Sequence, residues 1–259
     1  MDTNSHFAYV QARVQTRHGR RLSPSDWQTL ESARDIASFL QGLRSTHLSR
    51  WTEHLPVDVD PHRIEQSLRN DWKHYVMEIA SWVNADWRPS VEWFATLVDL
   101  QAIVHLARGY PVAYWMREDP VFSNYAFDDA VQRKEALAAS ETGAAMLALT
   151  PEQNPMAVWM EHWRSLHPDV GPGLRTRLDE FADIVITNLA VESEPGSQPR
   201  QGPRPVLLRD LEQHFRRCSG TIGAVFAHIG LMGLCWERLR AGLLMRVLVP
   251  LAQGRPQWA

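Results

Sequence analysis

Apolar residues recur along most of the chain at helical spacing, and no segment alternates apolar and polar residues over the length of a strand. Ile36, Phe39, Leu40 and Leu43 follow the i, i+3, i+4, i+7 pattern of one helix face. A longer apolar stripe extends over residues 64–82. The pattern therefore predicts an all-α fold.

Several expected helices begin where a proline follows another residue that suits a helix start, because proline fits the first helical turn. These pairs are Ser23-Pro24, Asp60-Pro61, Asn154-Pro155 and the less polar Arg88-Pro89. Ser23 and Asp26 also approximate a capping box. The expected helices cover residues 6–18, 36–43, 61–82, 89–109, 128–149, 155–166, 174–191, 206–218 and 221–249, with a short one beginning at residue 24.

The segment ESEPGSQPRQGPRP, residues 192–205, contains four prolines, two glycines and two serines and has no apolar periodicity. This composition is typical of a linker or loop. We therefore expect N-terminal helical lobes over residues 1–109 and a middle helical lobe over residues 110–191. Residues 206–259 are expected to form a C-terminal helical pair that completes the core.

Composition and charge narrow the class of protein. Hydrophobic residues make up 44% and charged residues 22% of the 259 residues, which excludes wholesale disorder and a fibrous repeat. The formal net charge of -3 provides no overall basic field for nucleic acid. Cys218 and Cys235 lack the C-x-x-C spacing of a thiolate zinc site and are too few for a disulfide framework, which favours a reducing compartment.

The sequence also lacks the signals of export or membrane insertion. The N-terminus has no basic region followed by an apolar run, so we expect no secretory signal. The longest apolar stretch, residues 221–235, is interrupted by His228 and followed by charged residues, and it is shorter than a spanning helix requires. We therefore expect a soluble, intracellular chain.

Signatures of catalysis are mostly absent, since the sequence has no phosphate-binding glycine motif, no H-E-x-x-H and no G-x-S-x-G. The nearest approach to a metal site is Asp71, His74 and Glu78, which share a helix face beside Glu65. A second carboxylate-x-x-His pair is missing, so we interpret this group as a solvated stripe and expect no cofactor. A helical enzyme or ligand-binding protein that uses these residues is an alternative.

Arg13, Arg17, Arg20 and Arg21 place four positive charges within nine residues and without an acid. Residues 13, 17 and 20 align on one side of a helix, so this group is a candidate contact for phosphates or for an acidic protein. Aromatic residues for base stacking are lacking around it, which disfavours single-stranded nucleic acid. A plain solvated face is the alternative interpretation.

The segment YVQARVQTRHGRRLSPSDWQTL, residues 9–30, resembles the opening of the C/d subunit family of A-type and V-type rotary ATPases. Residues 31–55, 63–69, 98–109 and 222–245 resemble later parts of the same family. The chain differs from the family pattern at Ala102, where an asparagine is expected, and around Cys235 in the last helix. These differences, together with a chain shorter than is usual in the family, indicate a divergent and short member of that family.

The resemblance implies a funnel-like assembly of three similar helical lobes that joins the central rotor stalk to the membrane rotor ring during proton or sodium transport. Such a subunit carries no catalytic residues and lies at the cytoplasmic side of the membrane as a peripheral protein. Arg13, Arg17, Arg20 and Arg21 would then contact acidic loops of the stalk or ring. A helical protein-binding scaffold unrelated to ATPases is the main alternative.

Overall fold

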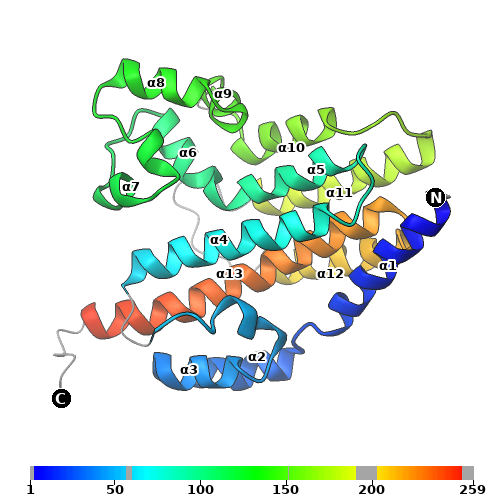
Figure 1. Ribbon diagram of the computed structural model, residues 1–259, viewed down its shortest axis with the longest axis horizontal. Coiled ribbons are helices and arrows are strands. Elements are labelled where there is room, and N and C mark those ends of the chain that lie inside the picture. The colour runs from blue at the N-terminus through cyan, green and yellow to red at the C-terminus, as the bar shows by residue number, and fades with distance from the viewer. Residues whose placement is uncertain (1–2, 57–59, 151, 191–202, 253–259) are drawn as a thin grey trace.

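The computed structural model describes residues 3–56, 60–150, 152–190 and 203–252, and this part of the chain contains helices and no strand. The all-α prediction is confirmed (Figure 1). In chain order the α-helices are α1 (Thr3–Gly19), α2 (Pro24–Glu31), α3 (Ile36–Leu43), α4 (Pro61–Ala80), α5 (Arg88–Glu92), α6 (Leu100–Ala107), α7 (Tyr114–Glu118), α8 (Ala130–Ala138), α9 (Glu141–Leu147), α10 (Pro155–Ser165), α11 (Pro172–Ala190), α12 (Pro203–Arg217) and α13 (Ile222–Ala252). The 3₁₀ segments are η1 (His47–Trp51), η2 (Trp93–Asp99) and η3 (Phe122–Asn124).

Helix α13 runs through the body and packs against α1, α3, α4, α11 and α12 (Figure 1). Its side chains Phe226, Ile229 and Leu231 are fully buried, so it forms the centre of the core. Over Ile222–Leu248 this helix is long and apolar enough to span a membrane, yet 72% of its most apolar 18-residue window is buried within the protein. Such burial is typical of a core helix.

The predicted helix starts are present. Ser23 and Asp26 form the capping box at α2, Asp60 accepts hydrogen bonds from the first turn of α4, and Asn154 does the same at α10. Each side-chain cap satisfies amide groups that the helix itself leaves free and contributes about 1 kcal/mol. Local sequence therefore fixes where these helices begin.

Two arginines of α13 hold the α2–α3 pair. Arg238 donates two hydrogen bonds to the carboxylate of Glu31, at 2.5 and 2.8 Å. Arg246 donates to the carbonyl oxygens of Glu31 and Ala33 and lies over the ring of Phe39, 4.1 Å from its centroid. Residues of the α2–α3 pair, near the beginning of the chain, are thus bonded directly to the last helix, α13.

The η2 segment and the end of α7 are joined to α4 through a buried ionic cluster. Arg69 of α4 binds Asp119, and its Nε lies 3.7 Å from Asp99, whose other oxygen lies 2.6 Å from the ammonium group of Lys73. Arg69 also lies over Phe122, 4.8 Å from the ring centroid. Burial of paired charges at this depth makes the joint sensitive to the loss of either partner.

The single helix expected over residues 128–149 is wrong. The structure has α8 and α9 instead, with Ser140 between them as the N-cap of α9. At Gly143 a Cβ atom would lie 2.2 Å from the carbonyl oxygen of Leu137, so glycine permits the close approach of the two helices. The alanine-rich composition concealed this turn.

The single helix expected over residues 89–109 is also interrupted, since η2 separates α5 from α6. Within η2, the carbonyl oxygen of Phe94 accepts a hydrogen bond from the indole of Trp72, and the indole of Trp93 donates to the carbonyl of Trp159. These hydrogen bonds position the large rings, and they occur where the backbone changes from α-helix to the 3₁₀ segment η2. The expected end at Gly109 is confirmed, where φ is +76°.

The buried apolar residues form one continuous cluster that includes residues from all three expected lobes. Where η2, α10 and α13 meet, Trp93 stacks on Trp159, Phe94 lies edge to face with Trp159 and Trp163, and Trp163 lies edge to face with Phe226. Most of the expected linker, residues 191–202, lies outside the described residues. Its last three residues, 203–205, belong to the first turn of α12, which corrects the boundary.

Candidate functional site

The arginine-rich end of α1 is the most distinctive surface that the sequence predicted. Helix α1 packs on α13, and its Val10 and Val14 are fully buried. Arg13 and Arg17 lie on the ring of Trp82, with guanidinium carbons 4.6 and 4.4 Å from its centroid. Stacking on an indole face holds both side chains in place while their charges stay near the surface.

Glu78 of α4 is shared by two arginines. Arg17 binds one carboxylate oxygen, and Arg50 of η1 donates to the other at 3.0 Å. Partial burial opposes ionisation of Glu78, but the hydrogen bonds from Arg50 and Arg17 outweigh it and lower the pKa of this carboxyl. Glu78 therefore connects α1, α4 and η1 as an anion.

Arg20 and Arg21 point in different directions. Arg21 bonds Glu212 of α12 at 2.8 Å, and its side chain is only 11% exposed. Arg20 is exposed, and its side chain has no hydrogen-bond or ionic partner among the described residues. The structure thus assigns Arg17 and Arg21 to contacts within the protein and leaves Arg13 and Arg20 more available to a partner.

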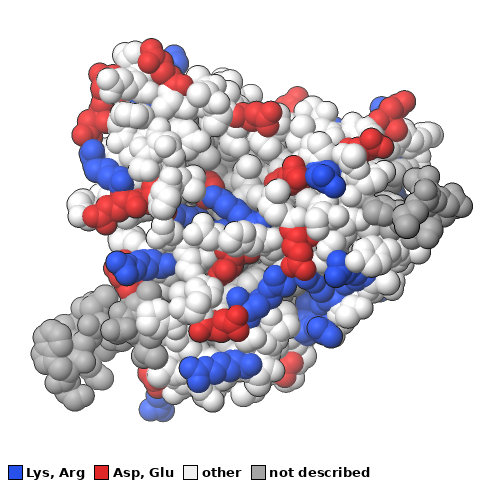
Figure 2. All heavy atoms as spheres, in the orientation of Figure 1, with Lys and Arg blue, Asp and Glu red and all other residues white. Residues whose placement is uncertain are grey.

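We call Arg13, Arg17, Arg20 and Arg50 the basic face. In Figure 2 blue atoms gather where the end of α1 meets α4 and η1, with few red atoms beside them. Four guanidinium groups and the single carboxylate of Glu78 leave an excess of positive charge there. Such a surface attracts acidic side chains and phosphate groups.

A layer of histidines lies beneath this face. The ring of His18 stacks on Phe215 with centroids 4.0 Å apart, and His228 bonds the hydroxyl of Tyr75 at 2.7 Å. Burial, followed by the positive charges of His18 and Arg17, lowers the pKa of His228 to about 3. This histidine is therefore neutral at physiological pH.

The group Asp71, His74 and Glu78 is not brought together as a metal site. Asp71 pairs with His54, whose Nε2 lies 3.3 Å away, while His74 is exposed and Glu78 binds arginines. Burial raises the pKa of Asp71. Among the residues that the structure describes, no three His, Cys, Asp or Glu side chains are placed to hold a metal ion.

Ser67, His54 and Asp71 share residue types with a hydrolytic triad but not its geometry. The hydroxyl of Ser67 and the carboxylate of Asp71 both face Nε2 of His54, at 2.5 and 3.3 Å. A triad needs the nucleophile on one ring nitrogen and the carboxylate on the other. This group therefore cannot relay a proton from serine to a base that aspartate orients.

Sequence reasoning found the arginines but missed their partners. The sequence pattern places Trp82 in an apolar stripe and Glu78 in a solvated stripe. It gives no signal for Arg50. Glu78 lies in the last turn of α4 and Trp82 follows two residues after the end of that helix at Ala80, so their spacing of four residues was the available signal. Which side chains Trp82 and Glu78 contact depends on how α1 crosses α4, and local sequence does not specify that crossing.

No family model matches the sequence, and no curated protein matches it.

Proposed function

We propose that this protein is a non-catalytic coupling subunit of a V-type or A-type rotary ATPase. It would link the central rotor stalk to the membrane rotor ring during proton or sodium transport. It would lie at the cytoplasmic side of the membrane as a peripheral subunit.

The observation that carries the proposal is the structural role of the residues that resemble the family. In the segment 9–30, Val14 is buried in the core, Arg17 binds α4 through Glu78, and Arg21 binds α12 through Glu212. These residues join α1 to three other helices. The segment that carries the resemblance thus includes residues on which the fold depends, and this supports the proposal.

Rigidity is the second support, because a subunit that transmits torque must deform little. The described segments are cross-connected by ion pairs between residues far apart in sequence, among them Arg240–Glu65 and Arg204–Glu237. The aromatic rings around Trp163 and Phe226 are packed at centroid distances near 5 Å, with 4.8 Å between these two. Dense packing of this kind transmits strain.

The basic face supplies the partner contact in this proposal. Arg13 and Arg20 are its most available charges, and both would pair with acidic loops of the stalk or ring. Arg17 would contribute mainly by holding α1 in position. Pairs of this type set the rate and orientation of docking more than its final affinity.

The test is reconstitution of ATP-driven ion pumping in vesicles that contain the remaining ATPase subunits, with and without this chain. We expect pumping to require the chain, and Arg13→Glu combined with Arg20→Glu to weaken assembly while ATP hydrolysis by the catalytic part continues. Arg63→Glu combined with Arg108→Glu, which reverses two exposed arginines outside the basic face, is the control for net charge. Pumping that is unchanged without the chain would refute the proposal and favour an unrelated protein-binding scaffold.

A further inference from the structure

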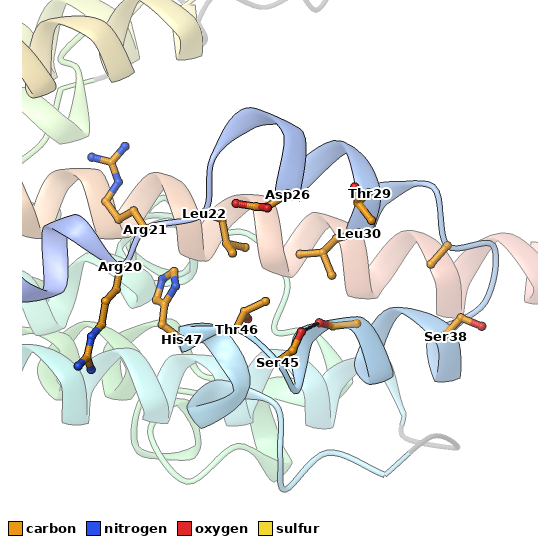
Figure 3. A pocket seen from close by; sticks show the side chains of 12 residues that line it. Arg20, Arg21, Leu22, Asp26, Thr29, Leu30, Ser38, Ser45, Thr46 and His47 are labelled. Carbon is orange, nitrogen blue, oxygen red and sulfur yellow. Dashed lines mark hydrogen bonds between the residues drawn. The ribbon is translucent and has the colours of Figure 1, made fainter.

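A cavity of about 800 Å³ lies between the end of α1, the α2–α3 pair and the start of η1 (Figure 3). It shares Arg20 with the basic face, and its other lining residues belong to none of the partner contacts proposed above. One end carries three basic side chains, Arg20, Arg21 and His47, and the remaining wall is formed largely by apolar and hydroxyl-bearing residues.

His47 is the unusual residue of this cavity. Both of its ring nitrogens are shielded from solvent, and neither has a hydrogen-bond partner among the described residues. Figure 3 shows the ring at the end of the cleft, between Arg20 and Arg21 and beside Leu22. Buried polar atoms are nearly always paired, so an unpaired imidazole beside a cavity indicates a missing partner.

The charge around His47 is positive and incompletely neutralised. Arg20 is exposed and has no side-chain partner among the described residues. In Figure 3 its guanidinium points away from Leu22 and Leu30, so this side chain has to turn inward to contact an anion beside His47. Arg21, at the opposite rim, bonds Glu212. The nearest lining acid, Asp26, accepts hydrogen bonds from the hydroxyl and the amide of Ser23. An anion at this end would complete both the hydrogen bonding and the charge balance.

The rest of the wall suits an organic group rather than a second charge. Leu22, Leu30 and Ala33 present apolar surface. The hydroxyls of Thr29 and Thr46 donate to main-chain carbonyl oxygens of their own segments, which leaves them only as acceptors toward the cavity. The space is also far larger than one phosphate group needs.

We propose that this cavity binds a phosphate ester, with the phosphate at the end formed by Arg20 and His47 and the organic part against Leu22 and Leu30. The phosphate belongs either to a soluble ester or to a lipid headgroup, because the recognition chemistry is the same. Arg20 supplies a charged donor, and the imidazole of His47 supplies a second donor.

Proton uptake accompanies binding in this arrangement. The charged and titratable groups around His47 are Arg20 and Arg21 of the turn after α1, Arg50 of η1, Asp26 of α2 and His228 of α13. Burial, followed by the charges of Arg21, Arg20 and Arg50, lowers the pKa of His47 to about 4. A bound anion opposes these charges and raises that pKa, so affinity increases as the pH falls.

Isothermal titration calorimetry of the whole chain tests the site with three probes: inorganic phosphate, phenyl phosphate and phenol. We expect phenyl phosphate to bind more tightly than inorganic phosphate, and phenol to show no binding. Arg20→Gln is expected to weaken phenyl phosphate binding at least about tenfold, the effect of one charged hydrogen bond. Arg63→Gln, an exposed arginine outside the cavity, should leave it unchanged. Equal losses in both variants, or no binding in the native chain, would overturn the proposal.

The role of His47 is tested with phenyl sulfate, whose own charge is constant between pH 7.5 and 5.5. The native chain should bind it more tightly at the lower pH, and His47→Gln should abolish that pH dependence while the circular dichroism spectrum stays native. If the affinity of His47→Gln for phenyl sulfate still depended on pH, His47 would not be the group that takes up the proton, and its role in the site would be refuted.

Sedimentation with vesicles distinguishes the two sources of phosphate. Binding to phosphatidylcholine vesicles that contain phosphatidic acid, lost in Arg20→Gln and absent for pure phosphatidylcholine, assigns the site to a lipid headgroup. Calorimetric binding of phenyl phosphate without vesicle binding assigns it to a soluble ester. Both measurements use the isolated chain, so their outcome is independent of assembly with an ATPase.

Discussion

The hydroxyl of Tyr75 on α4 lies 2.7 Å from Nε2 of His228 on α13, and both side chains are buried. Burial raises the pKa of Tyr75, so its hydroxyl remains protonated and can donate to the imidazole. The bond therefore joins two neutral groups in the centre of the bundle. Protonation of His228 would place an uncompensated charge beside Arg17 and His18.

Acid should destabilise the protein through this histidine. Burial lowers the pKa of His228 to about 3 in the native state, against 6.5 for an unperturbed histidine. Between these values the unfolded chain binds a proton that the native chain does not, so stability falls as pH falls below about 6.5 and is unaffected by this residue above it. At pH 5 the loss from His228 alone is about 2 kcal/mol.

Urea unfolding at pH 7.5 and pH 5.0 measures this effect. His228→Gln keeps a hydrogen-bonding side chain but cannot titrate, so the difference in stability between the two pH values should shrink by about 2 kcal/mol. His74→Gln, at an exposed position of α4, is the matched control. If the stability of His228→Gln depended on pH as strongly as that of the native chain, His228 would not be the cause of the acid destabilisation.

Glu78→Gln should loosen α1. The amide cannot neutralise Arg17 and Arg50, which both bind the carboxylate, and the partly exposed position limits the loss of stability to about 1 kcal/mol. Hydrogen exchange of the α1 amides should accelerate more than that of α11. Glu135→Gln on the exposed side of α8 serves as control, and equal acceleration there would show that the effect is not local.

Arg69→Met should be among the most damaging single substitutions. It leaves the buried carboxylates of Asp99 and Asp119 without their shared guanidinium, a loss of about 3–5 kcal/mol. Burial already raises the pKa of Asp99, and the variant should raise it further. Equilibrium unfolding measures the loss, and Arg63→Met, an exposed change on the same helix, should cost little.

Gly143→Ala and Gly173→Ala form a matched pair, because we expect the first to lower thermal stability and the second to leave it equal or raise it. At Gly143 the new methyl group would collide with the carbonyl of Leu137, so α8 and α9 must separate. At Gly173 no heavy atom lies within 4 Å of the added carbon, and alanine is the better helix former by up to about 1 kcal/mol. Thermal unfolding should show a lower midpoint for the first variant and an equal or higher one for the second.

Sequence pattern predicted the helices where apolar periodicity and capping residues agree. Ser23, Asp60 and Asn154 mark helix starts that the structure contains, and the stripe ending at Leu43 forms α3 as expected. Prediction failed where tertiary bonds override local preference. The indole of Trp72 bonding the carbonyl of Phe94, in the 3₁₀ segment, is such a case.

The candidate site was predicted only in part for a related reason. A run of arginines is visible in sequence, but whether each charge faces solvent depends on the helix it meets. Arg17 and Arg21 lie four residues apart and still bind different helices, α4 and α12. The cavity at His47 had no sequence signal, because its walls come from the turn after α1 and from α2, α3 and η1 with the segments that join them.

The bonds between Arg238 and Glu31 join residues 207 positions apart. During synthesis the α2–α3 pair leaves the ribosome roughly 10–40 s before its α13 partner exists, at common translation rates. Throughout that interval the apolar side of α3, including Phe39 and Leu43, has nothing from α13 to cover it. Until the last helix is released, these side chains therefore stay exposed or contact other parts of the nascent chain.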